Sequence, residues 1–192
     1  EKRIVFFREL DRERASEVLS MIDEGATREL IELLDESEIV DLVDLMASDD
    51  ATDVIHLLPP ERAQSVLGRI SRKEYEDVRE LLKYHEETAG GLMAREVMKV
   101  GGEMRISDVI ERLRSESEKI EQLQNVYVVD KLGLLLGHIP IINLLVEDPE
   151  SRAEEVMIRD FLSVTVDTDQ EEVATLFAKY DLYSLPVVDE RG

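Results

Sequence analysis

The first half of the chain repeats a short apolar pattern that has the period of an α-helix. Apolar residues recur three and four positions apart, as on one face of a helix, in the segments 15–22, 30–34, 39–46, 54–58, 63–70 and 78–82. Residues that favour helix ends separate these segments, such as Gly25, Asp35–Ser37 and Pro59–Pro60. Helices of about 10 residues are unstable alone in water. We therefore predict an all-α superhelical arrangement of short helices, a small α-solenoid, with an ordinary helical bundle as the alternative.

The helical pattern breaks at Thr88–Gly91, which reads Thr-Ala-Gly-Gly. A glycine inside a helix costs about 1 kcal/mol relative to alanine. We therefore predict that a helix ends here and that Gly90 and Gly91 form a hinge. The two glycines are too few to cradle a phosphate, and they do not follow a strand as a nucleotide-binding loop does.

The second half contains nearly the same strand twice. Val126–Asp130 reads VYVVD and Leu185–Asp189 reads LPVVD, so that the two aspartates lie 59 positions apart. An amphipathic helix precedes each strand, and a short β-branched segment precedes each helix, which indicates a duplicated unit. After Gly133 the first copy continues with another strand and helix, whereas the second stops at Gly192. We therefore expect the chain to be part of a longer protein.

Each copy has its own set of expected elements. In the first copy we predict a helix over 107–113, strands over 126–129 and 134–139, and a helix over 141–145. In the second copy we predict a strand over 163–166, a helix over 169–180 and a strand over 184–188. Thr168 and Glu171 have the spacing of a capping box at the start of the second helix.

Composition narrows the classes of function. With 192 residues, of which 43% are apolar, the chain is long and apolar enough to fold around real cores. Its net charge of −22 makes nucleic acids and anionic membrane surfaces poor partners and cations good ones. There is no cysteine, which excludes disulfides and thiolate catalysis. The longest apolar run, 132–146, is too short and too interrupted to span a membrane. Together with the lack of a signal peptide, these features favour the cytoplasm.

The sequence gives no indication of an enzyme. It has no Ser-His-Asp order, no phosphate-binding loop and no histidine-rich metal spacing. The three histidines, His56, His85 and His138, are isolated and are interpreted as surface or packing residues. Paired carboxylates are frequent, but nothing in the pattern indicates the concave apolar site that acid–base catalysis needs. We therefore expect a protein that is not an enzyme.

Two segments, in their order along the chain, carry a resemblance to a known family. Strand–helix–strand–strand–helix units in tandem resemble CBS domains. Here the run of short helices ends in Glu86–Met93, EETAGGLM, and Thr168–Ala174, TDQEEVA, lies in the second CBS-like copy. In this order the segments are similar to the cytosolic part of the MgtE family of magnesium transporters, and the resemblance covers nearly the whole chain.

The resemblance implies a multi-domain fold, all-α followed by α/β. It implies a helical N domain over 1–87, a hinge over 88–93, a first CBS domain over 94–149 and an incomplete second CBS domain over 150–192. In the family, Mg²⁺ ions between the N domain and the CBS pair hold the cytosolic part closed and shut a transmembrane pore, which lies in the same chain after the second CBS domain. The implied location is the cell membrane, with this part on the cytoplasmic side, and the implied assembly is a homodimer through the CBS domains.

The resemblance also implies the metal-binding residues. The positions that match the family's Mg²⁺ ligands are the carboxylates of Glu17, Asp49, Asp53, Asp169, Glu171 and Asp181 and the backbone carbonyl of Ala178. The chemistry agrees, because Mg²⁺ prefers carboxylates and retains several waters. Asp49 and Asp53 are four residues apart and repel each other on one helix face, and a cation would remove that repulsion. The alternatives are that Asp49 only caps its helix and that Glu171 only completes a capping box.

A different function for a CBS pair is adenine-nucleotide sensing in a soluble protein without a pore. CBS pairs often bind the ribose hydroxyls through an aspartate at the start of the last helix of a unit. The first copy has Asn143 at that place, and the second copy lacks the segment. This departure argues against a nucleotide cofactor, and the expected ligand is Mg²⁺ alone.

Overall fold

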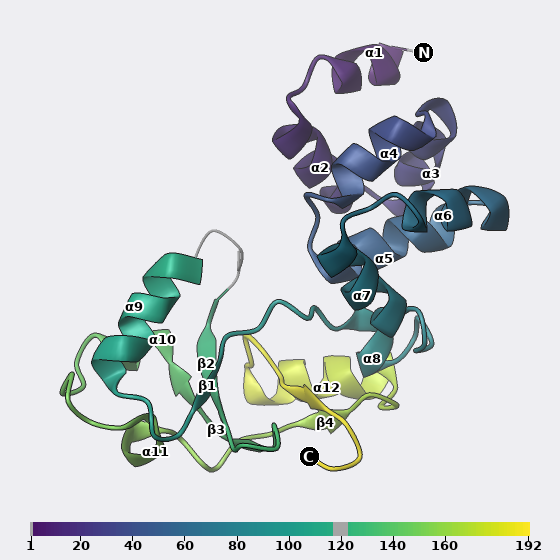
Figure 1. The fold of residues 1–192 in the computed structure, drawn as a ribbon. Coiled ribbons are helices and arrows are strands. Elements are labelled where there is room, and N and C mark those ends of the chain that lie inside the picture. Colours follow the sequence, from purple (N-terminus) through teal and green to yellow (C-terminus); the bar gives the residue numbers. More distant parts are fainter. Residues whose placement is uncertain (1, 117–122) are drawn as a thin grey trace. The chain divides into compact units, whose positions relative to one another are not determined.

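The computed structural model of the chain describes residues 2–116 and 123–192 (Figure 1). The chain divides into two compact units, one up to Tyr84 and one from His85 onward. We call them the helical unit and the sheet unit. Among the described residues, no helix is both long enough and apolar enough to cross a membrane.

The helical unit consists of short helices, as the apolar pattern predicts. Their bounds are α1 Lys2–Arg8, α2 Arg12–Met21, α3 Glu24–Leu33, α4 Glu36–Val43, α5 Ser48–Leu57, α6 Pro60–Leu67 and α7 Arg72–Leu81. Aspartates cap three of them: Asp11, Asp23 and Asp35 each accept a hydrogen bond from a backbone N–H three residues later. Helix α1 escaped the sequence prediction, because a run of adjacent apolar residues in one short segment shows no helical period.

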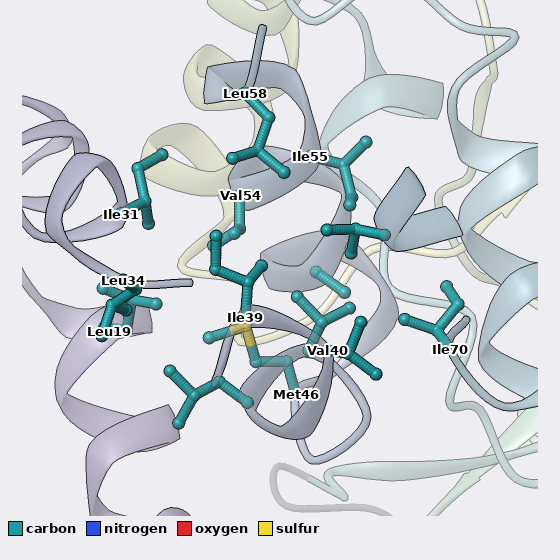
Figure 2. Packing of buried hydrophobic residues seen from close by; sticks show 14 of the residues in the cluster. Leu19, Ile31, Leu34, Ile39, Val40, Met46, Val54, Ile55, Leu58 and Ile70 are labelled. Atoms are coloured by element: carbon teal, nitrogen blue, oxygen red, sulfur yellow. The ribbon is translucent and has the colours of Figure 1, made fainter. Parts of the chain in front are cut away.

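Helices two apart in the sequence pack against each other in the helical unit. The contacting pairs include α1 with α3, α2 with α4, α4 with α6 and α5 with α7. A single apolar cluster runs through the unit, with Leu19 from α2, Ile31 from α3, Ile39 from α4 and Val54 from α5 (Figure 2). This packing explains why helices of at most 10 residues are stable here, since each one buries its apolar face against its neighbours.

The sheet unit contains both copies of the repeat. Its elements are α8 Ala89–Leu92, β1 Lys99–Gly101, α9 Ile106–Glu116, β2 Asn125–Val129, β3 Leu135–Pro140, α10 Ile141–Leu144, α11 Ala153–Val156, β4 Val164–Thr165, α12 Gln170–Tyr180 and β5 Val187–Val188. In the first copy β1 runs parallel to β2, and β2 runs antiparallel to β3. In the second copy β4 runs parallel to β5. The predicted strands are therefore present, although β4 and β5 are shorter than expected.

The structure confirms the duplication. Helices α9 and α12 correspond to each other: each is described over 11 residues, and α12 begins 64 positions after α9 begins. The paired strands also correspond, because Val100 lies opposite Val128 in one copy and Val164 opposite Val187 in the other. Equivalent residues of the two copies are 64 positions apart before the helix and 59 positions apart after it. The first copy is therefore five residues longer between its helix and its next strand. That segment includes 117–122, which lie outside the described residues.

The segment at Thr88–Leu92 differs from the prediction. Ala89–Leu92 forms the short helix α8, and Thr88 is its N-cap, with its side chain accepting a hydrogen bond from the Gly91 N–H. A helix therefore begins at this point and does not end here. The glycines are tolerated because surrounding backbone, and not helix propensity, fixes this turn. The hinge that was expected over 88–93 stays a prediction.

Candidate metal-binding residues

The start of α12 positions two of the expected metal ligands. Asp169 is the N-cap, and its Oδ1 accepts a hydrogen bond of 2.8 Å from the Glu171 N–H. The capping-box prediction is thus wrong: the N-cap is Asp169 and not Thr168, whose Oγ1 accepts instead from the Thr165 N–H at 3.1 Å. Glu171 is exposed in the first turn. Both residues therefore lie at the positive end of the helix dipole.

The end of α12 contains two more of the expected metal ligands, Ala178 and Asp181. Asp181 ends the helix in a left-handed conformation, with φ 51° and ψ 47°. The Leu182 N–H donates to the Phe177 carbonyl at 3.2 Å. In a continuous helix it would instead donate to the carbonyl of Ala178. Ala178 and Asp181 are therefore both in the last turn of α12, at the negative end of the helix dipole, where a cation is favoured.

These two pairs cannot share one ion. Asp169 and Asp181 are 12 residues apart along α12, and a helix rises about 1.5 Å per residue, so their backbones are separated by about 18 Å. The arrangement allows two separate metal positions on one helix. Each end would offer one or two protein oxygens, and water would complete the coordination, which is how Mg²⁺ is commonly held.

Helix α5 carries the expected ligands Asp49 and Asp53. The N-cap of α5 is Ala47, which makes no side-chain capping bond, and Asp49 is the second helical residue. The alternative in which Asp49 only caps its helix is therefore wrong. Asp49 is half-buried with its Oδ1 shielded from solvent, while Asp53 is exposed one turn later on the same face. The structure thus confirms that the two residues share one face of α5, as their spacing predicts, whereas their role as metal ligands stays a prediction.

Glu17 is exposed on α2. Within residues 2–116 and 123–192, no group of three or more carboxylate or imidazole side chains is arranged to hold a metal ion. The chain alone thus offers single carboxylates and pairs, and the expected ligand set stays a prediction.

The internal duplication provides a comparison for the Asp169 position. The equivalent residue in the first copy, 64 positions earlier, is Arg105, and its Nη1 donates a hydrogen bond to the Glu150 carboxylate. Counted by the same 64 positions, the equivalent of Glu150, which precedes α11, is Glu86, which precedes α8. One copy therefore has an arginine–glutamate ion pair where the other has two carboxylates.

The backbone shows that these positions correspond. The Ile106 N–H donates to the Ser151 carbonyl, and its counterpart, the Gln170 N–H, donates to the Glu87 carbonyl, both at 2.9 Å. Likewise the Ala153 N–H bonds the Met104 carbonyl, as the Ala89 N–H bonds the Thr168 carbonyl. Sequence reasoning missed α8 and α11 as equivalent elements. The available signal was the 64-residue spacing of the alanines, both of which are almost fully buried.

Asn143, at the position that CBS pairs use for ribose, is half-buried in the four-residue helix α10. The nearby strand β3 holds His138, whose ring makes an edge-to-face contact with Phe161 at a centroid distance of 6.1 Å. Burial lowers the pKa of His138 below its usual value of 6.5. The imidazole therefore favours its neutral form.

Comparisons with known proteins match both units. Residues 1–87 match the family described as the MgtE intracellular N domain, and residues 153–192 match the CBS domain family. The magnesium transporter MgtE of Thermus thermophilus is 43% identical over 116 residues, which are 60% of this chain and 26% of that protein. MgtE of Enterococcus faecalis is 32% identical over 61% of this chain and 26% of its own length. The matched region thus spans about a quarter of these relatives.

Solved structures agree over a larger part of the chain. The cytosolic domain of the Mg²⁺ channel MgtE in complex with ATP is 34% identical, with a TM-score of 0.93 over 100% of this chain and 78% of that one. The soluble part of a magnesium transporter is 26% identical, with a TM-score of 0.89 over 97% and 73%. The predicted fold, a helical domain followed by CBS domains, is confirmed.

Proposed function

Because this chain belongs to the MgtE family of magnesium transporters, we propose that it is the cytosolic magnesium-sensing region of such a transporter. Mg²⁺ binds between the helical N domain and the CBS pair, which is the sheet unit, and the bound form closes a transmembrane pore in the same full-length chain. When Mg²⁺ is scarce the domains separate and the pore opens. The region works as a homodimer through its CBS domains and performs no catalysis.

One observation carries the proposal. Asp181 keeps a left-handed backbone conformation, which is uncommon for a residue with a side chain, at the end of the helix whose last turn contains Ala178. Strained conformations of this kind cluster at ligand-binding positions. A carboxylate and a carbonyl at the negative end of α12 make a suitable pair of ligands for a hard, hydrated cation.

Two further features support a cation at these places. The net charge is −22, and both parts of the chain are acidic, with 24 acidic and 12 basic residues up to Glu87 and 21 and 11 after it. Divalent cations would reduce the repulsion between two such domains and favour their docking. In addition, the second CBS copy has Asp169 and Glu86 at the positions where the first copy has the Arg105–Glu150 ion pair. Asp169 therefore places a negative charge where the first copy has the positive charge of Arg105.

The proposal predicts that Mg²⁺ compacts the chain. Small-angle X-ray scattering is expected to give a smaller radius of gyration in millimolar Mg²⁺ than in chelator, because an ion that binds only the docked form favours it by mass action. Monovalent salt at the same ionic strength is the control for screening. Equal compaction in that salt would contradict specific Mg²⁺ binding.

Substitutions of single carboxylates distinguish specific Mg²⁺ ligands from residues that contribute only to the overall negative charge. Asp181→Ala and Asp49→Ala are expected to raise the Mg²⁺ concentration needed for compaction. Glu32→Ala, which removes an exposed carboxylate of the helical unit that is outside the proposed set, is the matched control. If all three variants shift the midpoint equally, Mg²⁺ acts as a diffuse ion atmosphere.

A second candidate function is adenine-nucleotide sensing. It is favoured by the 34%-identical cytosolic domain that was solved in complex with ATP. Asn143 in place of an aspartate argues against it. Calorimetric titration of the chain with ATP in chelator tests this candidate directly. The continuation of the gene tests the transporter, which requires about five apolar spans of about 20 residues each.

A further inference from the structure

The connection between the two units is short, and hydrogen bonds hold the chain on both sides of it. On the helical side, the backbone after α7 stays bonded to that helix. The Lys83 N–H donates to the Glu80 carbonyl at 3.2 Å, and the Tyr84 N–H donates to the Leu81 carbonyl at 3.0 Å. Val78, one turn earlier in α7, is fully buried in the apolar cluster of the helical unit. The chain therefore belongs to the helical unit up to the amide of Tyr84.

On the other side, the chain is fixed from the carbonyl of His85. That carbonyl accepts the Thr88 N–H at 3.0 Å and the Thr88 hydroxyl at 2.8 Å. The His85 ring also takes part, because its Nδ1 accepts the Glu87 N–H at 3.2 Å. These bonds form one tight turn that leads directly into α8. The turn belongs to the sheet unit.

Helix α8 is in turn attached to the second CBS copy. The Ala89 N–H donates to the Thr168 carbonyl at 2.7 Å, and the Gly90 N–H donates to the Val166 carbonyl at 2.8 Å. From the opposite direction, the Gln170 N–H donates to the Glu87 carbonyl at 2.9 Å. Ala89 and Gly90 are buried. Three backbone hydrogen bonds thus hold α8 between β4 and the start of α12.

The glycines of this segment have a packing role. A Cβ atom on Gly91 would lie 2.3 Å from the His85 carbonyl oxygen and 2.9 Å from the Glu86 Cα. Both neighbours are backbone atoms, which cannot move aside as the end of a side chain can. Gly91 therefore allows the close approach of two backbone segments, which is a different use of glycine from flexibility.

We propose that the hinge of this protein lies at the junction of Tyr84 and His85, and that α8 with its two glycines moves as a rigid part of the CBS pair. Only the few backbone torsions between the Tyr84 amide and the His85 carbonyl remain to absorb a domain movement. Since Glu87 and Gln170 are bonded, the movement begins next to Asp169, the first candidate ligand on α12. The hinge position follows from the hydrogen bonds alone and does not depend on magnesium.

Amide hydrogen exchange in chelator tests the proposal on the unmodified chain. The amides of Ala89, Gly90 and Gln170 are expected to exchange at least about tenfold more slowly than that of His85, because opening them requires undocking α8. If Ala89 and Gly90 exchange as fast as His85 while the amides of β2 stay protected, the hinge includes α8 and the proposal is overturned.

Distance distributions between two spin labels give a second test. The chain has no cysteine, so labels can be placed at Glu32→Cys and Lys131→Cys, which are exposed positions in the two units. His85→Pro fixes φ of residue 85 and restricts Tyr84 to extended conformations. It is expected to narrow the distribution in chelator, whereas His85→Ala, which removes only the ring, is not.

Gly91→Ala distinguishes the two hinge positions by the sign of its effect. At a flexible hinge, alanine would restrict the backbone and narrow the distribution. At a packed glycine, the clash of the new Cβ with the His85 backbone would loosen α8 and widen the distance distribution. A narrower distribution for Gly91→Ala, with no change for a folded His85→Pro variant, would overturn the proposal. Should His85→Pro fail to fold by circular dichroism, amide exchange decides the question.

Discussion

At the scale of the residue, backbone conformation gives Asp181 a measurable signature. Among the described residues it is the non-glycine residue with a positive φ. Aspartate tolerates the left-handed region better than most residues, but glycine adopts it without steric strain. A residue chosen for stability alone would be glycine at this helix end. Aspartate is therefore expected where its carboxylate is needed.

Replacing Asp181 separates stability from ion binding. Asp181→Gly is expected to raise the free energy of unfolding in chelator by up to about 1 kcal/mol, because the left-handed strain is relieved. Asp181→Asn keeps a residue that tolerates this conformation and removes a negative charge from the negative end of the helix dipole, so it should raise the free energy of unfolding in chelator by about 0.3–1 kcal/mol. Both variants should respond less to Mg²⁺. Urea unfolding with and without Mg²⁺ measures these effects, and a Gly variant less stable than wild type in chelator would refute the strain argument.

His138 gives the sheet unit a defined pH dependence. Burial lowers its pKa from 6.5, so as the pH falls through about 6.5 the unfolded chain takes up a proton before the folded chain does. The free energy of unfolding is therefore expected to fall between that pH and the lower pKa of the folded state. His138→Gln should remove this part of the dependence. Urea unfolding at pH 7.5 and 5.5 tests it, and an equal loss of stability in both proteins would show that His138 does not contribute.

Single residues also show where prediction from sequence stops. The i,i+4 spacing placed Asp49 and Asp53 on one helix face, and this is confirmed. The cap of α12 was assigned to Thr168 and is Asp169, because the Thr168 hydroxyl is used by Thr165. Thr168 and Asp169 are both good caps, and only the neighbouring strand decides between them. Gly91 likewise suggested flexibility, since the sequence does not reveal the backbone of His85 beside it.

At the scale of the element, the dipole of helix α5 acts differently on Asp49 and on Asp53. Asp49 is in the first turn, where the helix dipole favours a negative charge by about 0.3–1 kcal/mol. Asp53 lies beyond that turn, and its repulsion from Asp49 costs about 0.2–0.5 kcal/mol. The two carboxylates therefore differ in their effect on the stability of the helix, although they form one candidate pair.

This difference predicts unequal effects of the same substitution. In chelator, Asp53→Ala should stabilise the helical unit by up to about 0.5 kcal/mol, whereas Asp49→Ala should be neutral or destabilising by a few tenths of a kcal/mol. With Mg²⁺ present, both variants should lose part of the stabilisation by the ion. Denaturant unfolding measures all four values. Stabilisation of similar size by both substitutions in chelator would mean that the dipole has no effect at Asp49.

Helices long enough to show a period were predictable, whereas the four-residue helices were predicted only in part: α10 was expected over 141–145, but α8 and α11 were not. Helices α2 to α7 have 8 to 10 residues and show an apolar face in the sequence. The four-residue helices α8 and α11 contain barely one turn, so no periodicity can identify them. Their backbone hydrogen bonds to strands and turns far away in the sequence determine them, and such bonds follow from the tertiary fold.

At the scale of the whole molecule, buried apolar residues are distributed unequally between the two CBS copies. The apolar cluster of the sheet unit includes Val100, Val126, Val128 and Ile139 from the strands of the first copy. The second copy contributes less, since α12 has no buried residue and β4 and β5 have two residues each. Burial of apolar surface is the main source of stability. The second copy should therefore be the less stable part of the sheet unit.

Amide exchange at one hydrogen-bonded backbone amide in each CBS copy tests this inequality. The Val166 N–H bonds the Val188 carbonyl at 3.2 Å, and the Tyr127 N–H bonds the Met98 carbonyl at 2.8 Å, so both amides are hydrogen-bonded within their copies. Val166 is nevertheless expected to exchange faster, because opening the second copy exposes less apolar surface. Equal protection would contradict the prediction and point to an additional surface that covers the second copy. If that surface belongs to another molecule of the same protein in a dimer, the protection of the Val166 amide will fall on dilution while that of the Tyr127 amide stays constant. A concentration-independent result would instead show that the short strands and α12 are stable by themselves.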